Sequence, residues 1–201
     1  MIAMRPKGIL LTIAFSLLCP AAVPGQARPP EPYIDRDVCP FECCVYREWV
    51  ARSSIPAYDR AEGHAVVFRL RPGERFAALG GNVHLRRIGV AVASDTVRLD
   101  TGDTLRAPVR LTPGDTLYVL SYLGEGAFNV WFRGKRYETF GFWPEPGQES
   151  TTTIAVGAVP VAGTLLRAPI FDWWVRVRNA NRQTGWILMD EAHVDGEDLC
   201  A

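Results

Sequence analysis

The sequence predicts an all-β protein, and two observations carry that prediction. Apolar and polar residues alternate over short runs, such as residues 65–70, 116–120 and 173–177, and Gly, Pro or Asp bounds these runs. Alternation with a period of two residues indicates a strand with one buried face. No long amphipathic helix pattern is found, and one short helical turn is expected around residues 41–49. With 48% hydrophobic residues and 15 prolines, the chain suits one or two compact β-domains.

The first residues are typical of a secretory signal peptide. Arg5 and Lys7 precede an apolar run, residues 8–18, and small residues follow up to Ala27. The run is shorter than the roughly 20 apolar residues that a membrane-spanning helix needs. We therefore expect residues 1–27 to be removed, which leaves an exported chain, periplasmic or secreted, without a membrane span.

Residues 28–49 form an N-terminal leader that contains a cysteine cluster. Its first part, residues 28–38, is rich in proline and polar residues, and little fixed structure is expected there. Of the five cysteines, Cys19 lies in the signal peptide, and the other four are Cys39, Cys43, Cys44 and Cys200. An even number of cysteines in an exported chain predicts disulfides.

The spacing of these cysteines predicts a bridge between the two ends of the chain, although four cysteines allow three pairings. Three of them lie near the beginning and one near the end. A zinc site built from all four is the alternative, and the lack of paired CxxC spacing disfavours it. No metal and no other cofactor is predicted.

A turn and the strand after it occur twice in the sequence. Residues 70–74, Leu-Arg-Pro-Gly-Glu, lead into the alternating run 75–79, and residues 111–115, Leu-Thr-Pro-Gly-Asp, lead into 116–120. In each copy proline fixes φ at the first corner and glycine accepts a positive φ at the second, which predicts a type II turn. The repeat predicts two similar small β-units, or one larger barrel with this period.

The last expected strands contain three tryptophans. Alternation places Trp173 on the buried face, and Trp174 with Arg176 on the exposed face. Trp186 is expected in the core. Exposed aromatic rings near arginines are typical of binding surfaces. The candidate ligand-binding residues are therefore Trp174, Arg176, Tyr122 and Trp131.

Together these pieces resemble the bacterial SH3-like (SH3b) domains of exported cell-envelope proteins. That pattern has a Pro-Gly turn with an alternating strand, then Trp-x-x-Val, a polar turn, and Gly-Trp followed by an aliphatic residue. The corresponding pieces here are residues 111–120, 174–177, 179–184 and 185–187. The resemblance implies small SH3-like barrels, two in tandem. The weaker first unit, residues 50–104, lacks the Gly-Trp ending, and the second, 105–201, has an insertion at about 123–168.

A second resemblance would exchange the two faces of the tryptophan strand. Trp173 and Trp174 are similar to the double-tryptophan strand of eukaryotic SH3 domains, where the first tryptophan contacts the ligand. A slip of one residue moves every side chain to the opposite face. The alternation is preferred here. The tyrosine and proline that complete a polyproline groove in those domains are missing after residue 187, so recognition of PxxP ligands is not expected.

The resemblance implies a non-catalytic binding module whose partner is a cell-wall peptide or glycan, or an envelope protein. The balance of 22 basic and 22 acidic residues gives no indication of nucleic-acid binding. One alternative is a structural or accessory subunit of an envelope assembly. Another is an enzyme that uses Cys43 or Cys44, but no histidine lies in a recognisable nucleophile motif with them. No catalytic residue is therefore predicted.

Overall fold

The computed structural model describes residues 27–96, 98–99, 109–124, 127–139, 163–189 and 193–200. Strands form the regular structure of these residues, and they contain no α-helix, so the all-β prediction is confirmed. Where a helical turn was expected, there is an irregular turn followed by the strand β2 (Glu48–Ala51). In the described part of the chain, no helix is long and apolar enough to cross a membrane. Except for Ala27, the predicted signal peptide lies outside the described residues.

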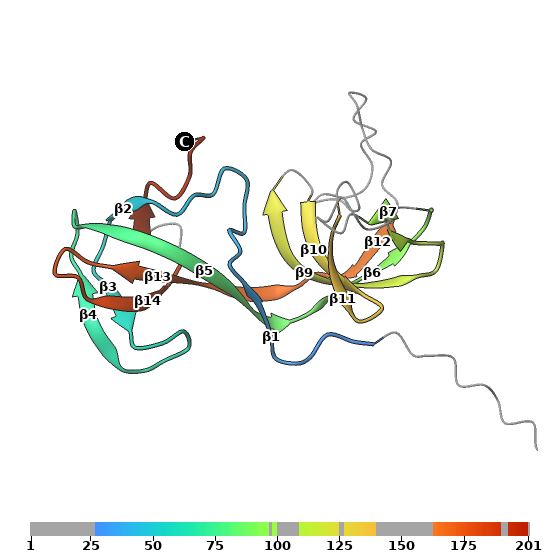
Figure 1. The fold of residues 1–201 in the computed structure, drawn as a ribbon, viewed down its shortest axis with the longest axis horizontal. Coiled ribbons are helices and arrows are strands. Elements are labelled where there is room, and N and C mark those ends of the chain that lie inside the picture. Colours follow the sequence, from blue (N-terminus) through green and yellow to red (C-terminus); the bar gives the residue numbers. More distant parts are fainter. Residues whose placement is uncertain are drawn as a thin grey trace, which may run out of the picture.

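The first sheet has eight strands and curls into a half-barrel (Figure 1). Its strands are β1 (Tyr33–Arg36), β2 (Glu48–Ala51), β3 (Ile55–Tyr58), β4 (Val66–Leu70), β5 (Arg75–Arg87), β13 (Ile170–Arg178), β14 (Thr184–Leu188) and β15 (Val194–Asp195). Their order is β15-β2-β5-β13-β14-β3-β4, and β1 pairs with the last part of β5.

The second sheet has five strands. They are β6 (Gly89–Ala93), β9 (Thr116–Gly124), β10 (Ala127–Phe132), β11 (Lys135–Thr139) and β12 (Gly163–Arg167), in the order β11-β10-β9-β6-β12. A separate antiparallel pair is formed by β7 (Arg98–Leu99) and β8 (Val109–Arg110). Three of these strands, β10, β11 and β12, come from the segment predicted as an insertion, and residues 140–162 of that segment lie outside the described residues.

In the sequence, the strands of the second sheet lie between β5 and β13 of the first sheet. The chain leaves the first sheet at the end of β5, forms the second sheet, and returns in β13, which pairs with β5 in antiparallel register. The two strands run as a long ribbon between the sheets (Figure 1). Strands from both sides of residue 105, where the sequence suggested a boundary, therefore share one sheet. The sheets are nested in the sequence rather than consecutive.

The two Pro-Gly turns have the same backbone hydrogen bonds. Gly73 and Gly114 have φ values of 79° and 90°. In each turn the N–H of the fourth residue donates to the carbonyl of the first, at 2.9 and 3.0 Å. The glycine N–H donates to the last residue of a neighbouring strand in the sheet, Ala51 of β2 at 2.7 Å and Ala93 of β6 at 2.8 Å. The strand orders β15-β2-β5-β13-β14 and β12-β6-β9-β10-β11 also correspond, so each Pro-Gly turn leads into the central strand of its five-strand set.

The burial of strand β13 confirms the prediction for one of its faces and corrects the prediction for the other. Trp173 and the valines at 175 and 177 are buried, as the alternation predicted. Trp174 was expected to be exposed, but it is only 7% exposed, and its ring packs edge-on against Tyr58, with the ring centroids 5.9 Å apart. Tyr58 lies on β3, and the curl of the half-barrel brings these side chains together across β14. Trp186, expected in the core, is only partly buried.

The leader is also more ordered than its composition predicts. Residues 33–36 form β1, and Asp35 is buried at the junction of the two sheets. Its carboxylate accepts hydrogen bonds from Ser121 on β9 and Asn129 on β10, and Arg136 on β11 lies 3.1 Å from its other oxygen. Backbone pairing with β5 and this polar cluster together offset the entropy cost of ordering the segment.

Candidate functional site

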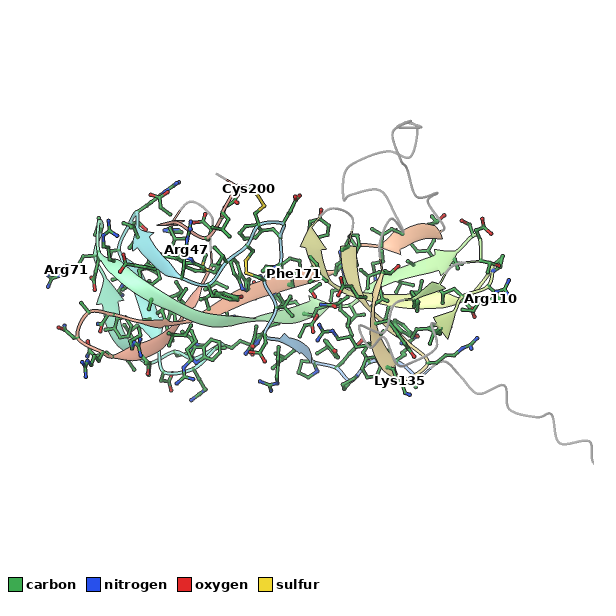
Figure 2. All side chains as sticks on the ribbon, turned by 45° about the horizontal axis from the view of Figure 1, so that its top comes forward. Arg47, Arg71, Arg110, Lys135, Phe171 and Cys200 are labelled. Carbon is green, nitrogen blue, oxygen red and sulfur yellow. A yellow bond between two sulfur atoms is a disulfide. The ribbon has the colours of Figure 1, made fainter. Side chains whose placement is uncertain are left out.

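Both disulfides meet in the loop at residues 39–44. Cys39 is bonded to Cys44, and Cys43 to Cys200, so the predicted bridge between the chain ends is confirmed. Figure 2 shows the sulfur–sulfur bonds in yellow beside the labelled Cys200. With their sulfurs bonded in pairs, these cysteines do not form the alternative zinc site. Asp198 lies close to Cys43 and Cys200, but the two sulfurs are bonded to each other. The loop is thus fixed against the first sheet.

Trp173 is positioned by contacts with this loop and its neighbours. Its indole N–H donates to the Tyr46 hydroxyl at 3.1 Å, and that hydroxyl donates to the Val38 carbonyl at 2.6 Å. The Trp173 and Phe41 rings pack edge-on, with centroids 5.7 Å apart. Both the indole and the phenol cross β5 at Gly81, where a Cβ atom would lie 2.6 Å from the indole nitrogen. Glycine is therefore required at this crossing.

The Tyr46 hydroxyl should titrate late. Burial raises its pKa from 10.0 to about 12, although the hydrogen bond from Trp173 acts in the opposite direction. Because the folded pKa is higher than the unfolded one, the stability that neutral Tyr46 contributes is complete below pH 10.0 and is lost as the pH rises through about 12. A titration of tyrosinate absorbance should show a step near pH 12 that Tyr46→Phe removes. A step that persists in this variant would contradict the assignment.

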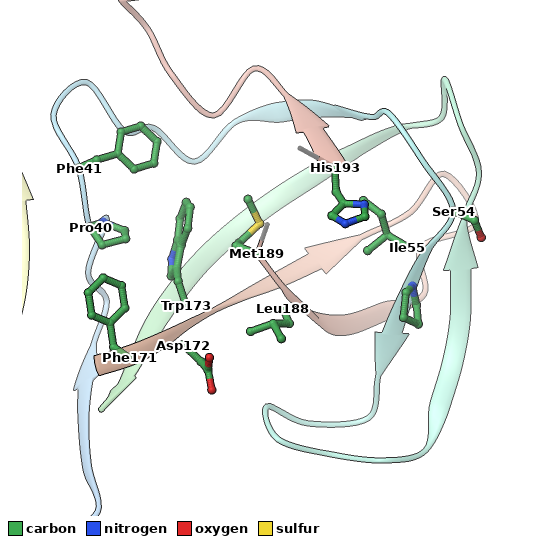
Figure 3. Close-up of a pocket in the computed structure, with 11 residues that line it drawn as sticks. Pro40, Phe41, Ser54, Ile55, Phe171, Asp172, Trp173, Leu188, Met189 and His193 are labelled. Atoms are coloured by element: carbon green, nitrogen blue, oxygen red, sulfur yellow. The ribbon is translucent and has the colours of Figure 1, made fainter. Parts of the chain in front are cut away.

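A groove of about 560 Å³ lies between the disulfide loop and the end of the half-barrel. It is lined by Pro40, Phe41, Ser54, Ile55, Pro56, Phe171, Asp172, Trp173, Leu188, Met189 and His193. Figure 3 shows Phe41 and Phe171 on one side and Ile55 and His193 on the other, with Trp173 between them. Most of the lining is aromatic, aliphatic or proline, and a few polar groups lie among these side chains. This is the usual composition of a binding pocket.

Two polar groups of the groove, the Asp172 carboxylate and the His193 imidazole, are already engaged with the protein. Asp172, the one carboxylate among the described lining residues, forms an ion pair with Arg86. The imidazole Nδ1 of His193 lies within hydrogen-bond distance of the Ser53 hydroxyl. The groove therefore presents an apolar surface without an uncompensated charge.

The structure separates the four residues that were predicted to bind a ligand. Trp174 is buried and Arg176 is exposed, both on β13 of the first sheet. Tyr122 and Trp131 are in the second sheet and are partly buried. Tyr122 packs against Phe128, and Trp131 packs against Tyr33 of the leader. The four do not form one site.

Sequence reasoning missed the residues that line the groove. They come from four segments that are far apart in the chain, near residues 40, 55, 172 and 189. No local pattern connects these segments. One usable signal was Phe41, an aromatic residue between closely spaced cysteines, where bridging brings the ring to the surface of a fixed loop.

Comparison of the chain with protein-family models, curated proteins and solved structures finds no match. The resemblance to SH3-like domains stays a prediction. The functional interpretation therefore depends on the groove and the disulfide loop.

Proposed function

We propose that this protein is an exported, non-catalytic binding module that holds the peptide part of the cell wall in the groove beside the disulfide loop. The observation that carries the proposal is the lining of the groove, in which Phe41, Phe171 and Trp173 present aromatic rings to an apolar space. Concave apolar sites with a few polar groups are the usual form of ligand sites. The two disulfides support the export part, because such bonds persist in oxidising compartments.

The chemistry of the lining favours peptide over glycan. Sugar hydroxyls need hydrogen-bond partners when they leave water, and an unpartnered polar group is costly to bury. The groove offers mainly rings and alkyl groups, and Asp172 is already paired with Arg86. Methyl and methylene groups of a peptide can be buried there without such a loss.

The geometry also favours binding without a large ordering cost. The loop that carries Phe41 is bridged within itself and to Cys200, and Trp173 is held by the Tyr46 hydroxyl. Rigid sites lose little conformational entropy when a ligand binds. The non-catalytic part is supported by Cys43 and Cys44, because both thiols that an enzyme of this kind would need are bonded in disulfides.

Co-sedimentation with purified peptidoglycan sacculi tests this function. The wild-type chain should pellet with intact sacculi, and Phe41→Ala or Phe171→Ala should weaken binding by about 10-fold or more, as is usual for aromatic residues at the centre of an interface. Leu166→Ala is the matched control, because Leu166 is an exposed apolar residue of the second sheet, 63% exposed and not part of the groove. It should bind like the wild type.

Amidase treatment of the sacculi distinguishes the two parts of the wall. The peptides that it releases should compete with intact sacculi for the protein and reduce pelleting, and the peptide-free glycan strands should not. Competition by the glycan strands alone would contradict the ligand class. Equal binding by the two phenylalanine variants and the wild type would contradict the site. A wild type that does not pellet would contradict cell-wall binding and direct the search to an envelope protein.

A further inference from the structure

We propose a second binding site, on the face of the second sheet that carries Tyr118 and Trp131. Its ligand class is a proline-rich peptide segment that contains arginine, and residues 27–33 of this chain, which span the end of the predicted signal peptide and the start of the leader, are its resident occupant. This inference does not depend on the groove, which belongs to the first sheet and has none of these residues in its lining.

The leader makes side-chain-specific contacts with this face. The Arg28 guanidinium lies 5.9 Å from the centroid of the Tyr118 ring, and its Nε donates to the Tyr118 hydroxyl at 3.2 Å. The Trp131 indole N–H donates to the Ala27 carbonyl at 2.8 Å. Tyr33 packs edge-on against Trp131, with ring centroids 5.9 Å apart, and Pro29 between these contacts is buried. The contacts thus lie at the two ends of the segment, and residues 30–32 between them are exposed.

The chemistry of these contacts defines the ligand class. The segment Arg-Pro-Pro-Glu-Pro, residues 28–32, has few backbone N–H donors but keeps every carbonyl acceptor, because proline has no N–H. An indole donor such as Trp131 is complementary to such a backbone. A guanidinium over a tyrosine face is a favourable cation–π contact. Proline also limits the entropy lost on docking, so short segments of this type bind well to aromatic surfaces.

The anchor of the leader lies next to this site and is separate from it. Asp35, beyond the proline-rich segment, is held in the buried polar cluster with Ser121 and Asn129. The segment is thereby tethered beside its own docking face, which gives it a high effective concentration there. A competing peptide binds the wild type weakly for this reason, and binds more tightly when the contacts of the leader are removed.

The Ala27 carbonyl connects this site to the expected processing of the chain. Ala27 is the last residue of the predicted signal peptide. A chain cut after Ala27 keeps the contacts of Arg28 and Pro29 and loses the acceptor for the Trp131 indole N–H. That donor is then available for the carbonyl of an incoming peptide.

The test uses the full chain and a labelled peptide with the leader sequence, acetyl-Ala-Arg-Pro-Pro-Glu-Pro-Tyr-amide. Binding is measured by fluorescence anisotropy to the wild type and to an Arg28→Ala, Pro29→Ala double variant. The double variant should bind the peptide about 10-fold more tightly, because the resident segment competes less well. Adding Trp131→Phe, which keeps a ring but removes the indole donor, should reverse most of this gain.

Two controls decide between the outcomes. A peptide with alanine in place of its arginine and first proline should bind at least about 10-fold more weakly than the leader peptide. Phe41→Ala should leave binding unchanged, which separates this site from the groove. If the double variant melts like the wild type but binds the two peptides equally, or no better than the wild type does, the proposal is wrong and the leader contacts depend on the covalent tether.

Discussion

Replacing Cys43 and Cys200 by serine should lower the free energy of unfolding by about 4–5 kcal/mol, because their bridge closes a very long loop. The two residues are 157 positions apart, so the bridge restricts nearly the whole described chain in the unfolded state. It also holds the C-terminal residues against the loop that forms one side of the groove. Guanidinium unfolding of the oxidised protein, followed by tryptophan fluorescence, measures the loss.

The other disulfide supplies the matched control. Cys39 and Cys44 are only 5 positions apart, and in the same chain-entropy treatment their replacement by serine should cost about 2 kcal/mol. The difference between the two double variants tests the role of loop length. Equal losses, or a larger loss for the short bridge, would contradict this explanation.

Asp35→Ala should lower the free energy of unfolding by about 3–5 kcal/mol, as is usual when one partner of a buried charged cluster is removed. The Asp35 side chain is 1% exposed and accepts hydrogen bonds from Ser121 and Asn129, the latter at 2.9 Å. Arg136 lies 3.1 Å from its other oxygen. The substitution removes the acceptor of the Ser121 hydroxyl, leaves Asn129 with only the Ser121 oxygen as acceptor, and releases β1 from three strands of the second sheet.

Arg36→Ala is the control for this prediction. Arg36 is the next residue on β1, is exposed, and should change the free energy of unfolding by less than about 0.5 kcal/mol. Urea unfolding of both variants provides the comparison. An Asp35→Ala protein as stable as Arg36→Ala would show that the polar cluster does not hold the leader.

The features that the sequence predicts are local ones. Alternation and the two Pro-Gly turns depend on neighbouring residues, and Gly73 and Gly114 have the positive φ that their positions require. The strand that carries the Gly-Trp pair was also predicted, and the structure explains the glycine at 185. A Cβ atom there would lie 3.0 Å from side chains of Ala57 on β3 and Val67 on β4, because both strands lie close to Gly185 at this point.

The features that the sequence does not predict depend on which strands become partners. β13 pairs with β5 although the second sheet lies between these two strands in the sequence, and the local alternation of residues does not predict such a pairing. The burial of Trp174 is another example. In a flat sheet the face that carries Trp174 would be exposed, but in the curled sheet Tyr58 packs over its ring. The groove is of this kind too, since its lining combines the bridged loop of Phe41 with residues of β13 and β14 that are far away in the sequence.

The most direct test of the groove as the ligand site is an NMR titration of the tryptophan indole N–H signals. The chain has six tryptophans, and the described structure places Trp173 in the groove, with Trp131 on the second sheet and Trp174 under Tyr58. Peptides released from sacculi by amidase should shift the Trp173 signal saturably and leave those of Trp131 and Trp174 in place. No shift at Trp173, or a shift at Trp131 alone, would contradict the proposed function.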